Sequence, residues 1–278
     1  MGKVWIEVAL NGPWGRARQP GAPDEVAEIV AQGIACARAG ASIVHVHAYD
    51  GGGPQTFDWQ VYARIIEGIR AEIDVPVYPS IPMSGTDARF AHIEALATRG
   101  LLEFAVVDPG SVNFTTLEPG REPAPTYLNA EADIRHGLAL AVRYGFHPAY
   151  AIYEPGFTRA GAALARAART KTPLYRFMFS QTFAFGFPPE AFALDAHVAL
   201  LDREAPGAPW MIAGLGVDVT ALIPRAVSLG GHVRVGLEDA PFGCAHGNVA
   251  LVEDAVVRVR AAGGEPATVK DMRAALGA

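Results

Sequence analysis

Residues 40–53 read GASIVHVHAYDGGG, an apolar, β-branched run that follows one glycine and ends at three others. Such runs are typical of a strand buried in a parallel sheet. Two histidines, His45 and His47, stand one residue apart at its end. Because side chains alternate along a strand, both imidazoles are expected on the same face. The stretch therefore predicts a buried strand that ends in a pair of histidines.

Similar apolar runs recur along the chain and alternate with longer, Ala-rich amphipathic segments. The strands that we expect are VWIEVAL (4–10), SIVHVHA (42–48), VPVYPSI (75–81), EFAVVDP (103–109), PAYAIYE (148–154), PLYRFMF (173–179), PWMIAGL (209–215) and HVRVGLE (232–238). Helices are expected at 23–40, 58–73 and 130–145, among other segments. The first of these has Asp24 and Glu25 in its opening turn and Gly40 at its end, which are typical helix boundary signals.

Eight strand–helix units in 278 residues average about 35 residues each, which is the scale of a (β/α)₈ barrel. A doubly wound open sheet is the competing fold, but no GxGxxG motif follows the first strand. No linker rich in Ser, Pro or charge divides the chain. We therefore predict an α/β protein that forms one TIM barrel domain over residues 1–278.

Composition restricts the class of protein. The chain is 50% hydrophobic and 19% charged, with a net charge of −6, and its basic residues are scattered. Nucleic acid is therefore not an expected partner. The two cysteines, Cys36 and Cys244, form no CxxC pair, and no signal peptide or membrane-spanning run is evident. These features predict a cytoplasmic protein.

Reactive residues of a parallel barrel gather at the carboxyl ends of its strands. His45 and His47 lie at that end of the second expected strand, and Glu238 lies at that end of the eighth. Alternate strands contribute to the same layers of a barrel interior, so the three side chains are expected to meet. Two histidines and one carboxylate suit Zn²⁺ or another divalent transition metal, with a position left open for substrate. The competing interpretation is a hydrogen-bonded pair of core histidines.

Two further residues of the eighth strand suggest acid–base chemistry. Asp239 follows Glu238 at the strand end, and Arg234 lies below on the same face as Glu238. A carboxylate oriented by an arginine beside a metal is a candidate general base. A purely structural ion pair is the alternative. His232 precedes the strand and is expected at the opposite, stabilising end of the barrel.

Polar groups also follow the third and fourth strands. They are Ser80 and Ser84 in YPSIPMSG, and Asp108, Ser111 and Asn113 in VVDPGSVNF. Hydroxyl and backbone N–H groups in such loops are suited to holding a carboxylate or a developing oxyanion. Serine and glycine are also common turn formers, which is the alternative for either serine taken alone.

The segments GASIVHVHAYDGGG, DPGSVNF, AGLG and GGHVRVGLEDA, with GNVALV further on, together resemble the β-keto acid cleavage enzyme family, typified by 3-keto-5-aminohexanoate cleavage enzymes. The resemblance runs from the first strand to the last helix. It implies a zinc-dependent, oligomeric TIM barrel, with a tetramer favoured. Members of the family condense a β-keto acid with acetyl-CoA and release acetoacetate and a new acyl-CoA.

By this resemblance, His45, His47 and Glu238 are the zinc ligands, and zinc holds the keto oxygen and the carboxylate of the substrate. The resemblance also implies that Asp239, positioned by Arg234, takes the proton between those two groups. Ser80 matches a serine that contacts substrate in the family.

The sequence departs from the family pattern at four positions. Tyr49 and Val217 stand where many members carry arginine, which removes positive charge near the expected site of a CoA phosphate. Trp14 and Ala151 stand where members acting on amino-bearing keto acids carry glutamate. An ammonium-bearing substrate is therefore not expected, and Trp14 indicates a more apolar or bulkier substrate tail.

Two other functions compete with the family reaction. One is a metal-dependent lyase, aldolase or hydrolase that uses the same residues without CoA. The other is a metabolite-binding barrel without catalysis. The base candidate beside the metal ligands argues against the second, because a binder needs no such group.

Overall fold

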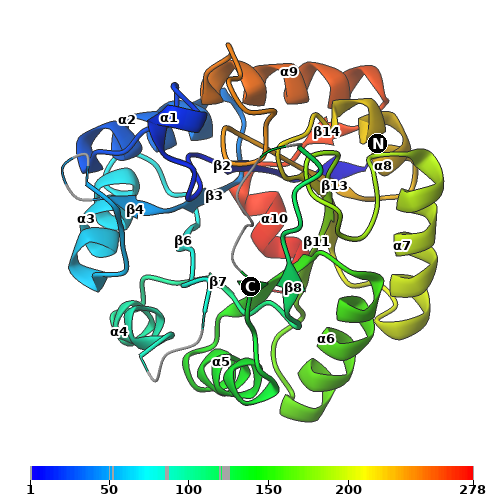
Figure 1. Cartoon of the computed structure of the whole chain (residues 1–278), viewed down its shortest axis with the longest axis horizontal. Coiled ribbons are helices and arrows are strands. Elements are labelled where there is room, and N and C mark those ends of the chain that lie inside the picture. Colours follow the sequence, from blue (N-terminus) through cyan, green and yellow to red (C-terminus); the bar gives the residue numbers. More distant parts are fainter. Residues whose placement is uncertain are drawn as a thin grey trace.

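The computed structural model describes residues 2–49, 51, 53–84, 88–118, 120 and 126–277. Its centre is a ring of eight parallel strands that follow one another in chain order (Figure 1). The strands are β2 (Ile6–Ala9), β3 (Ile43–Val46), β6 (Val77–Pro79), β7 (Phe104–Val106), β10 (His147–Ile152), β11 (Leu174–Phe179), β12 (Trp210–Gly214) and β13 (His232–Val235). All eight coincide with the expected runs, and the expected TIM barrel fold is confirmed.

The last strand of the ring, β13, pairs with the first, β2, and closes the barrel on that side. Between β6 and β7, which lie next to each other, the described residues form no hydrogen-bonded ladder. Arg273 bridges this seam below its strands. Its guanidinium bonds Asp74, just before β6, at 2.6 Å and Glu103, just before β7, at 2.8 Å. Arg70 adds a second bridge, because it donates to the carbonyl oxygen of Val75 at 3.4 Å and to Glu103 at 3.2 Å.

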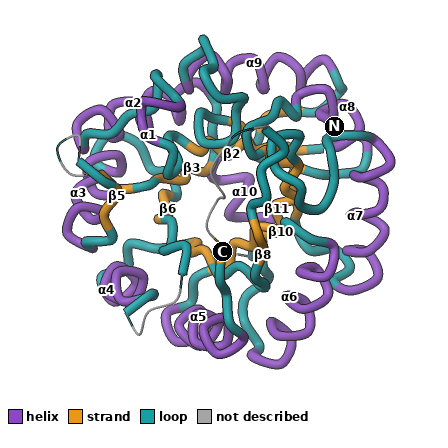
Figure 2. Tube along the Cα trace, viewed as in Figure 1, coloured by secondary structure: helices purple, strands orange, loops and turns teal. Residues whose placement is uncertain are grey.

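Helices surround the ring, as Figure 2 shows. They are α1 (Gly15–Arg18), α2 (Val26–Ala39), α3 (Trp59–Arg70), α4 (Ala91–Thr98), α5 (Glu131–Tyr144), α6 (Pro155–Ala168), α7 (Ala191–Glu204), the 3₁₀ turn η1 (Thr220–Leu222), α8 (Ile223–Ser228), α9 (Asn248–Ala261) and α10 (Val269–Ala275). None of the described helices is long and apolar enough to cross a bilayer. The α10 helix carries Arg273 and so covers the amino-terminal end of the barrel.

Among the described residues, three short strand pairs lie outside the ring. Two are antiparallel: β4 (Ala48–Tyr49) with β5 (Gln55–Thr56), and β8 (Val112–Asn113) with β9 (Thr126–Tyr127). Both lie beyond the carboxyl ends of ring strands, where they build the mouth of the barrel. The third pair is parallel and joins β1 (Lys3–Val4) to β14 (Glu265–Pro266) at the base.

The helix boundaries agree with the expected ones to within a few residues. The first expected helix is α2, which begins one turn later than Pro23, with Glu25 at its N-cap. Gly40 follows its end with a φ of 126°, a value that side chains other than glycine rarely adopt. Asp24 lies before the helix and accepts a hydrogen bond from Arg16 instead.

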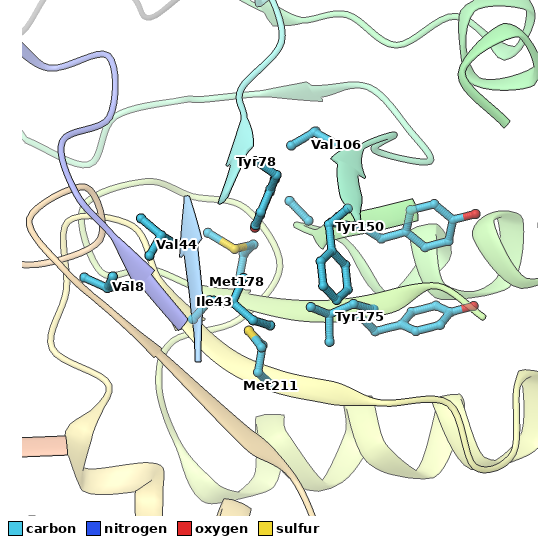
Figure 3. Close-up of a cluster of buried hydrophobic side chains, with 14 of the residues drawn as sticks. Val8, Ile43, Val44, Tyr78, Val106, Tyr150, Tyr175, Met178 and Met211 are labelled. Atoms are coloured by element: carbon cyan, nitrogen blue, oxygen red, sulfur yellow. The ribbon is translucent and has the colours of Figure 1, made fainter. Parts of the chain in front are cut away.

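Side chains of the ring strands alternate between the barrel interior and the surrounding helices. Tyr150 and Tyr175 face outward in an edge-to-face contact of 5.3 Å, whereas Tyr78 and Met178 line the interior (Figure 3). Outside the barrel, His197 of α7 stacks on Phe177 of β11 at 4.6 Å. Its imidazole is fully buried, and neither ring nitrogen has a hydrogen-bond partner among the described residues.

Burial lowers the pKa of His197 to about 4, from an ordinary value of 6.5. As the pH falls below 6.5, His197 therefore becomes protonated in the unfolded chain but stays neutral in the folded chain. By linkage, this one residue removes roughly 3 kcal/mol of folding stability between pH 6.5 and 4.

We expect His197→Leu to raise the thermal midpoint at pH 5 more than at pH 8, as measured by circular dichroism, because leucine has no proton-binding group to bury. The exposed His136→Leu is the control, and an unchanged acid limb in His197→Leu would contradict the prediction.

Candidate metal centre

His45 and His47 come from adjacent inward-facing positions at the end of β3. His45 lies within the strand and His47 directly follows it, and both are buried. Their rings meet edge to face with centroids 5.3 Å apart, and the His45 ring also packs on Tyr78 at 4.6 Å. Packing holds the rings in place, since neither Nδ1 atom has a hydrogen-bond partner among the described residues. The two Nε2 atoms face the same carboxylate.

That carboxylate is Glu238. The β13 strand ends at Val235, earlier than expected, and Glu238 follows after a turn rather than on a continuous strand. Gly236 makes the turn with a φ of 133°, and a Cβ there would lie 2.1 Å from the carbonyl oxygen of Ala9. Only glycine fits this position. The turn brings Glu238 Oε1 to 3.3 Å from His47 Nε2 and Oε2 to 3.5 Å from His45 Nε2.

The three side chains satisfy the requirements of a metal site. Their ligand atoms all lie within 4.8 Å of one another. Glu238 Oε2 is buried without a hydrogen-bond partner among the described residues, which is costly unless a cation binds there. Burial lowers the pKa of His45 well below its usual value, so this ring is in the neutral form that ligates metals. Two imidazoles and a carboxylate suit a divalent transition metal such as zinc.

Arg234, on β13, connects the carboxylates around this site. Its Nη1 donates to Glu7 Oε1 at 3.0 Å, and its Nε and Nη2 donate to the two oxygens of Asp239 at 2.8 and 2.7 Å. The same Nη2 lies 3.2 Å from Glu238 Oε1. All four side chains are buried. One donor atom therefore touches both Glu238 and Asp239.

The charges of this cluster do not balance. Glu7, Glu238 and Asp239 contribute three negative charges against one positive charge on Arg234, which leaves a formal charge of −2 inside the barrel. Burial raises the pKa of Asp239 to about 6, with Arg234 opposing the rise and neighbouring carboxylates adding to it. A divalent cation between the histidines and Glu238 offsets this excess.

A cavity of about 600 Å³ opens beside the histidines and Glu238. Of the residues expected from the sequence, Trp14, Ser80, Asp108 and Arg234 line it. Trp14 is anchored by its Nε1, which donates to the backbone oxygen of Glu238 at 2.8 Å. Ser80 is held by Gln55 Nε2 at 3.1 Å. The structure thus brings these groups together with the candidate metal ligands His45, His47 and Glu238.

Two other expected residues do not line that cavity. Ser111 accepts a hydrogen bond from the backbone N–H of Asn129 at 2.8 Å, and Asn113 accepts one from Thr126 at 2.8 Å. Both are exposed and belong to the region of the β8–β9 hairpin. Ser84, also considered from the sequence, is exposed as well. His232 lies where it was expected, at the start of β13, stacked on Trp5 at 4.1 Å.

A second cavity of about 510 Å³ lies on the other side of Arg234. Arg234 lines both cavities, whereas Asp239 lines only the second. Val217, one of the positions where the family pattern has arginine, also lines the second cavity and is buried. Tyr49, the other such position, donates its hydroxyl to the carbonyl oxygen of Gly12 at 2.6 Å. The Arg234–Asp239 pair therefore stands between two spaces.

Sequence reasoning missed several polar residues of the interior. Glu7, Tyr78 and Arg176 are buried and linked: Tyr78 OH donates to Glu7 at 2.7 Å and accepts from Arg176 at 3.2 Å. The signal was available, because a charged residue interrupts the apolar runs VWIEVAL and PLYRFMF at an inward position. A charge at such a position in a buried strand indicates a functional or paired group.

Comparison with known proteins gives consistent results. Residues 3–278 match the family model described as beta-keto acid cleavage enzyme. The chain is 28% identical over 280 residues to a 3-keto-5-aminohexanoate cleavage enzyme of Fusobacterium nucleatum subsp. nucleatum, covering 98% of this chain and 97% of that protein. It is 29% identical over 278 residues to a 3-oxoadipate:acetyl-CoA acetyltransferase of Cupriavidus necator, covering 98% and 94%.

Among solved structures, the apo structure of ObcA matches with a TM-score of 0.74 at 18% sequence identity. The match covers 94% of this chain, which spans 66% of the length of ObcA. At this identity the likeness supports the barrel fold alone.

Substitution of a ligand is expected to remove the metal without unfolding the chain. We expect the wild-type chain to retain one divalent ion after dialysis, and both Glu238→Gln and His45→Ala to lose it. The first removes the negative charge and one carboxylate oxygen, and the second removes an imidazole nitrogen. Metal affinity should fall by about tenfold or more, as measured by elemental analysis and competition with a chelator. The exposed His136→Ala is the control. Unchanged metal content in both ligand variants would rule out this centre.

Proposed function

Because the chain belongs to the β-keto acid cleavage enzyme family, it is an enzyme that acts on β-keto acids, and we propose that it condenses a β-keto acid with acetyl-CoA to give acetoacetate and an acyl-CoA. The observation that carries the proposal is the convergence of His45, His47 and Glu238 beside the Arg234–Asp239 pair. The name of the Cupriavidus necator relative, an acetyl-CoA acetyltransferase, supports the use of acetyl-CoA.

We propose Zn²⁺ as the metal, held by His45, His47 and Glu238. A zinc ion in such a site acts as a Lewis acid toward the keto and carboxylate oxygens of a substrate, which makes the C2 protons between them more acidic. The protein determines where the metal would lie, because His45, His47 and Glu238 line the cavity together with Arg234. Ser80, held by Gln55 and lining the same cavity, is suited to donate a hydrogen bond to the substrate carboxylate.

Asp239 is the proposed general base. Arg234 binds both of its oxygens, and the shared Nη2 donor keeps the Asp239 carboxylate beside the metal ligand Glu238. Asp239 takes one C2 proton, and the resulting enolate carbon attacks the acetyl-CoA carbonyl and expels the CoA thiolate. The thiolate then attacks the original keto carbon, and the bond between C2 and C3 breaks. Protonation of C2 by Asp239 releases acetoacetate and leaves the new acyl-CoA.

The two cavities support a reaction between two substrates. The β-keto acid is proposed to bind in the cavity lined by the metal ligands, with its C2 at the Arg234–Asp239 pair that borders the second cavity. The thioester is proposed to approach from the second cavity, which adjoins Asp239. The two reactants then meet at Arg234, which lines both spaces.

A metal-dependent lyase or hydrolase that works without CoA is the second candidate. It is favoured by the environment of Tyr49 and Val217, since neither side chain can bind a phosphate as the family's arginines would. Dependence of turnover on acetyl-CoA separates the two candidates. A cytoplasmic location and a homo-oligomeric state, with a tetramer favoured by the resemblance, remain predictions.

The proposed reaction is tested by acetoacetate formation from β-keto acids and acetyl-CoA. We expect activity to need both acetyl-CoA and metal, to be lost on chelation and to return with zinc. Asp239→Asn should lower kcat by about 10²–10⁴-fold because the base is removed, while metal content is kept. Asp195→Asn, which removes an exposed carboxylate of α7 paired with Arg225, is the matched control.

One outcome would contradict this reaction, and another would contradict the assignment of the base. Cleavage of β-keto acids without acetyl-CoA would favour the lyase or hydrolase. Full activity in Asp239→Asn would exclude this residue as the base while leaving the metal chemistry intact.

A further inference from the structure

The cavity beside the metal ligands is walled by aromatic rings. The rings belong to Trp14, Phe114, Tyr127, Tyr153 and Phe183. They contact one another: Trp14 stacks on Phe183 with centroids 6.1 Å apart, and Phe114 meets Tyr153 edge to face at 5.2 Å. Phe114 also contacts Phe183 at a centroid distance of 5.7 Å, so the rings form a continuous wall.

Apolar side chains of the barrel strands complete the space. Val106 of β7, Ala151 of β10 and Met178 of β11 line it from neighbouring inward positions. Ala151 pairs in register with Arg176 on the next strand. Because its side chain is a single methyl group, it leaves space in the cavity beside Arg176. A substrate group placed here exchanges water for carbon contacts, which favours apolar groups.

The charged residues on this side of the cavity are already paired with each other. Asp108 accepts hydrogen bonds from Tyr127 OH at 2.7 Å and from the backbone N–H of Ala151, and it lies 3.5 Å from Arg176 Nη2. Arg176 also donates to Tyr78 OH at 3.2 Å and to the carbonyl oxygen of Ala149 at 3.3 Å. The pair is buried and carries no net charge. Neither a cationic nor an anionic group would find an uncompensated opposite charge here among the described residues.

Aromatic walls also bind quaternary ammonium groups, so the rings alone do not exclude a cation. The position of Arg18 argues against one. Its guanidinium carbon lies 3.7 Å from the ring centroid of Phe242 and 5.6 Å from that of Trp14, and the residue lines the cavity. Trp14 therefore already faces a cation, and the charge of that cation is itself paired, because Arg18 Nη2 lies 3.9 Å from Glu118.

We propose that the group R in the substrate R–CO–CH₂–COO⁻, which leaves as the acyl-CoA, is uncharged and apolar, with the width of a branched alkyl chain or an aryl ring. This inference rests on the proposed function, because it assigns the cavity to the part of the β-keto acid that extends away from the metal. Burial of an unpaired charge costs free energy, whereas burial of apolar surface lowers the free energy of the complex.

Three pairs of substrates of matched shape test the proposal with the wild-type, zinc-loaded enzyme and acetyl-CoA. Each pair compares a charged tail with its neutral isostere. The pairs are 3-oxo-5-aminohexanoate with 3-oxo-5-methylhexanoate, 3-dehydrocarnitine with 5,5-dimethyl-3-oxohexanoate, and 3-oxoadipate with 6-methyl-3-oxoheptanoate. We expect kcat/KM to be higher for the neutral member of every pair by about tenfold or more.

A charged member that equals or exceeds its neutral partner overturns the proposal and names the tail that the enzyme accepts. Absence of acetoacetate from all six compounds has a different meaning, because the proposed function itself then fails. The two failures are therefore distinguishable in one experiment.

A variant tests whether the neutral Asp108–Arg176 pair causes the preference for an uncharged tail. Asp108→Asn removes the negative charge of the pair and leaves Arg176 positive in the cavity. The ratio of kcat/KM for 3-oxoadipate to that for 6-methyl-3-oxoheptanoate should rise by about tenfold or more. Ser111→Ala, in the loop just beyond Asp108 but outside the cavity, is the matched control. Metal content and thermal midpoint report whether the variant is folded, and an unchanged ratio in folded Asp108→Asn contradicts the role of the pair.

Discussion

The guanidinium of Arg234 is the contact on which the site depends. Its nitrogens touch Glu7, Glu238 and Asp239, and all four groups are buried. Without this cation, three buried carboxylates would face one another with their mutual repulsion uncompensated. The planar fork of arginine also fixes direction, because two of its N–H groups bind both oxygens of Asp239. One residue thus sets the positions of a proposed metal ligand and of the proposed base.

The barrel makes this arrangement possible, because parallel strands deliver their carboxyl ends to one face. The adjacent strands β13, β2 and β3 carry Arg234, Glu7 and His45. Strand β11 on the far side carries Arg176. Tyr78 of β6 connects the two groups, since its hydroxyl donates to Glu7 and accepts from Arg176. The metal side and the opposite side of the interior are therefore joined through one phenol, beside the seam where β6 and β7 form no ladder among the described residues.

The sequence predicts the ring strands and the convergence of the three candidate metal ligands, for identifiable reasons. A spacing of two residues fixes the face of His45 and His47, and the shared parity of strands two and eight brings Glu238 to them. The positions of loop residues are harder to predict. Ser111 and Asn113 follow a ring strand, but the pairing of β8 with β9 leaves both exposed to solvent. No periodicity in the sequence predicts that orientation. Buried partnerships such as Tyr78 with Glu7 join residues 71 positions apart, so their pairing depends on the folded barrel.

Charge balance links the two sides of the interior to what each can bind. A buried charge must be compensated by the protein or by a bound species, since desolvation is otherwise too costly. The cluster around Arg234 retains a formal excess of −2, which a divalent cation offsets. The Asp108–Arg176 pair retains none, so a charged tail there would have no partner. Selection on tail chemistry can then act through Asp108, Arg176 and the residues around them while the cluster that is proposed to perform the chemistry stays unchanged. A family that shares one reaction and varies its substrate tail requires this separation.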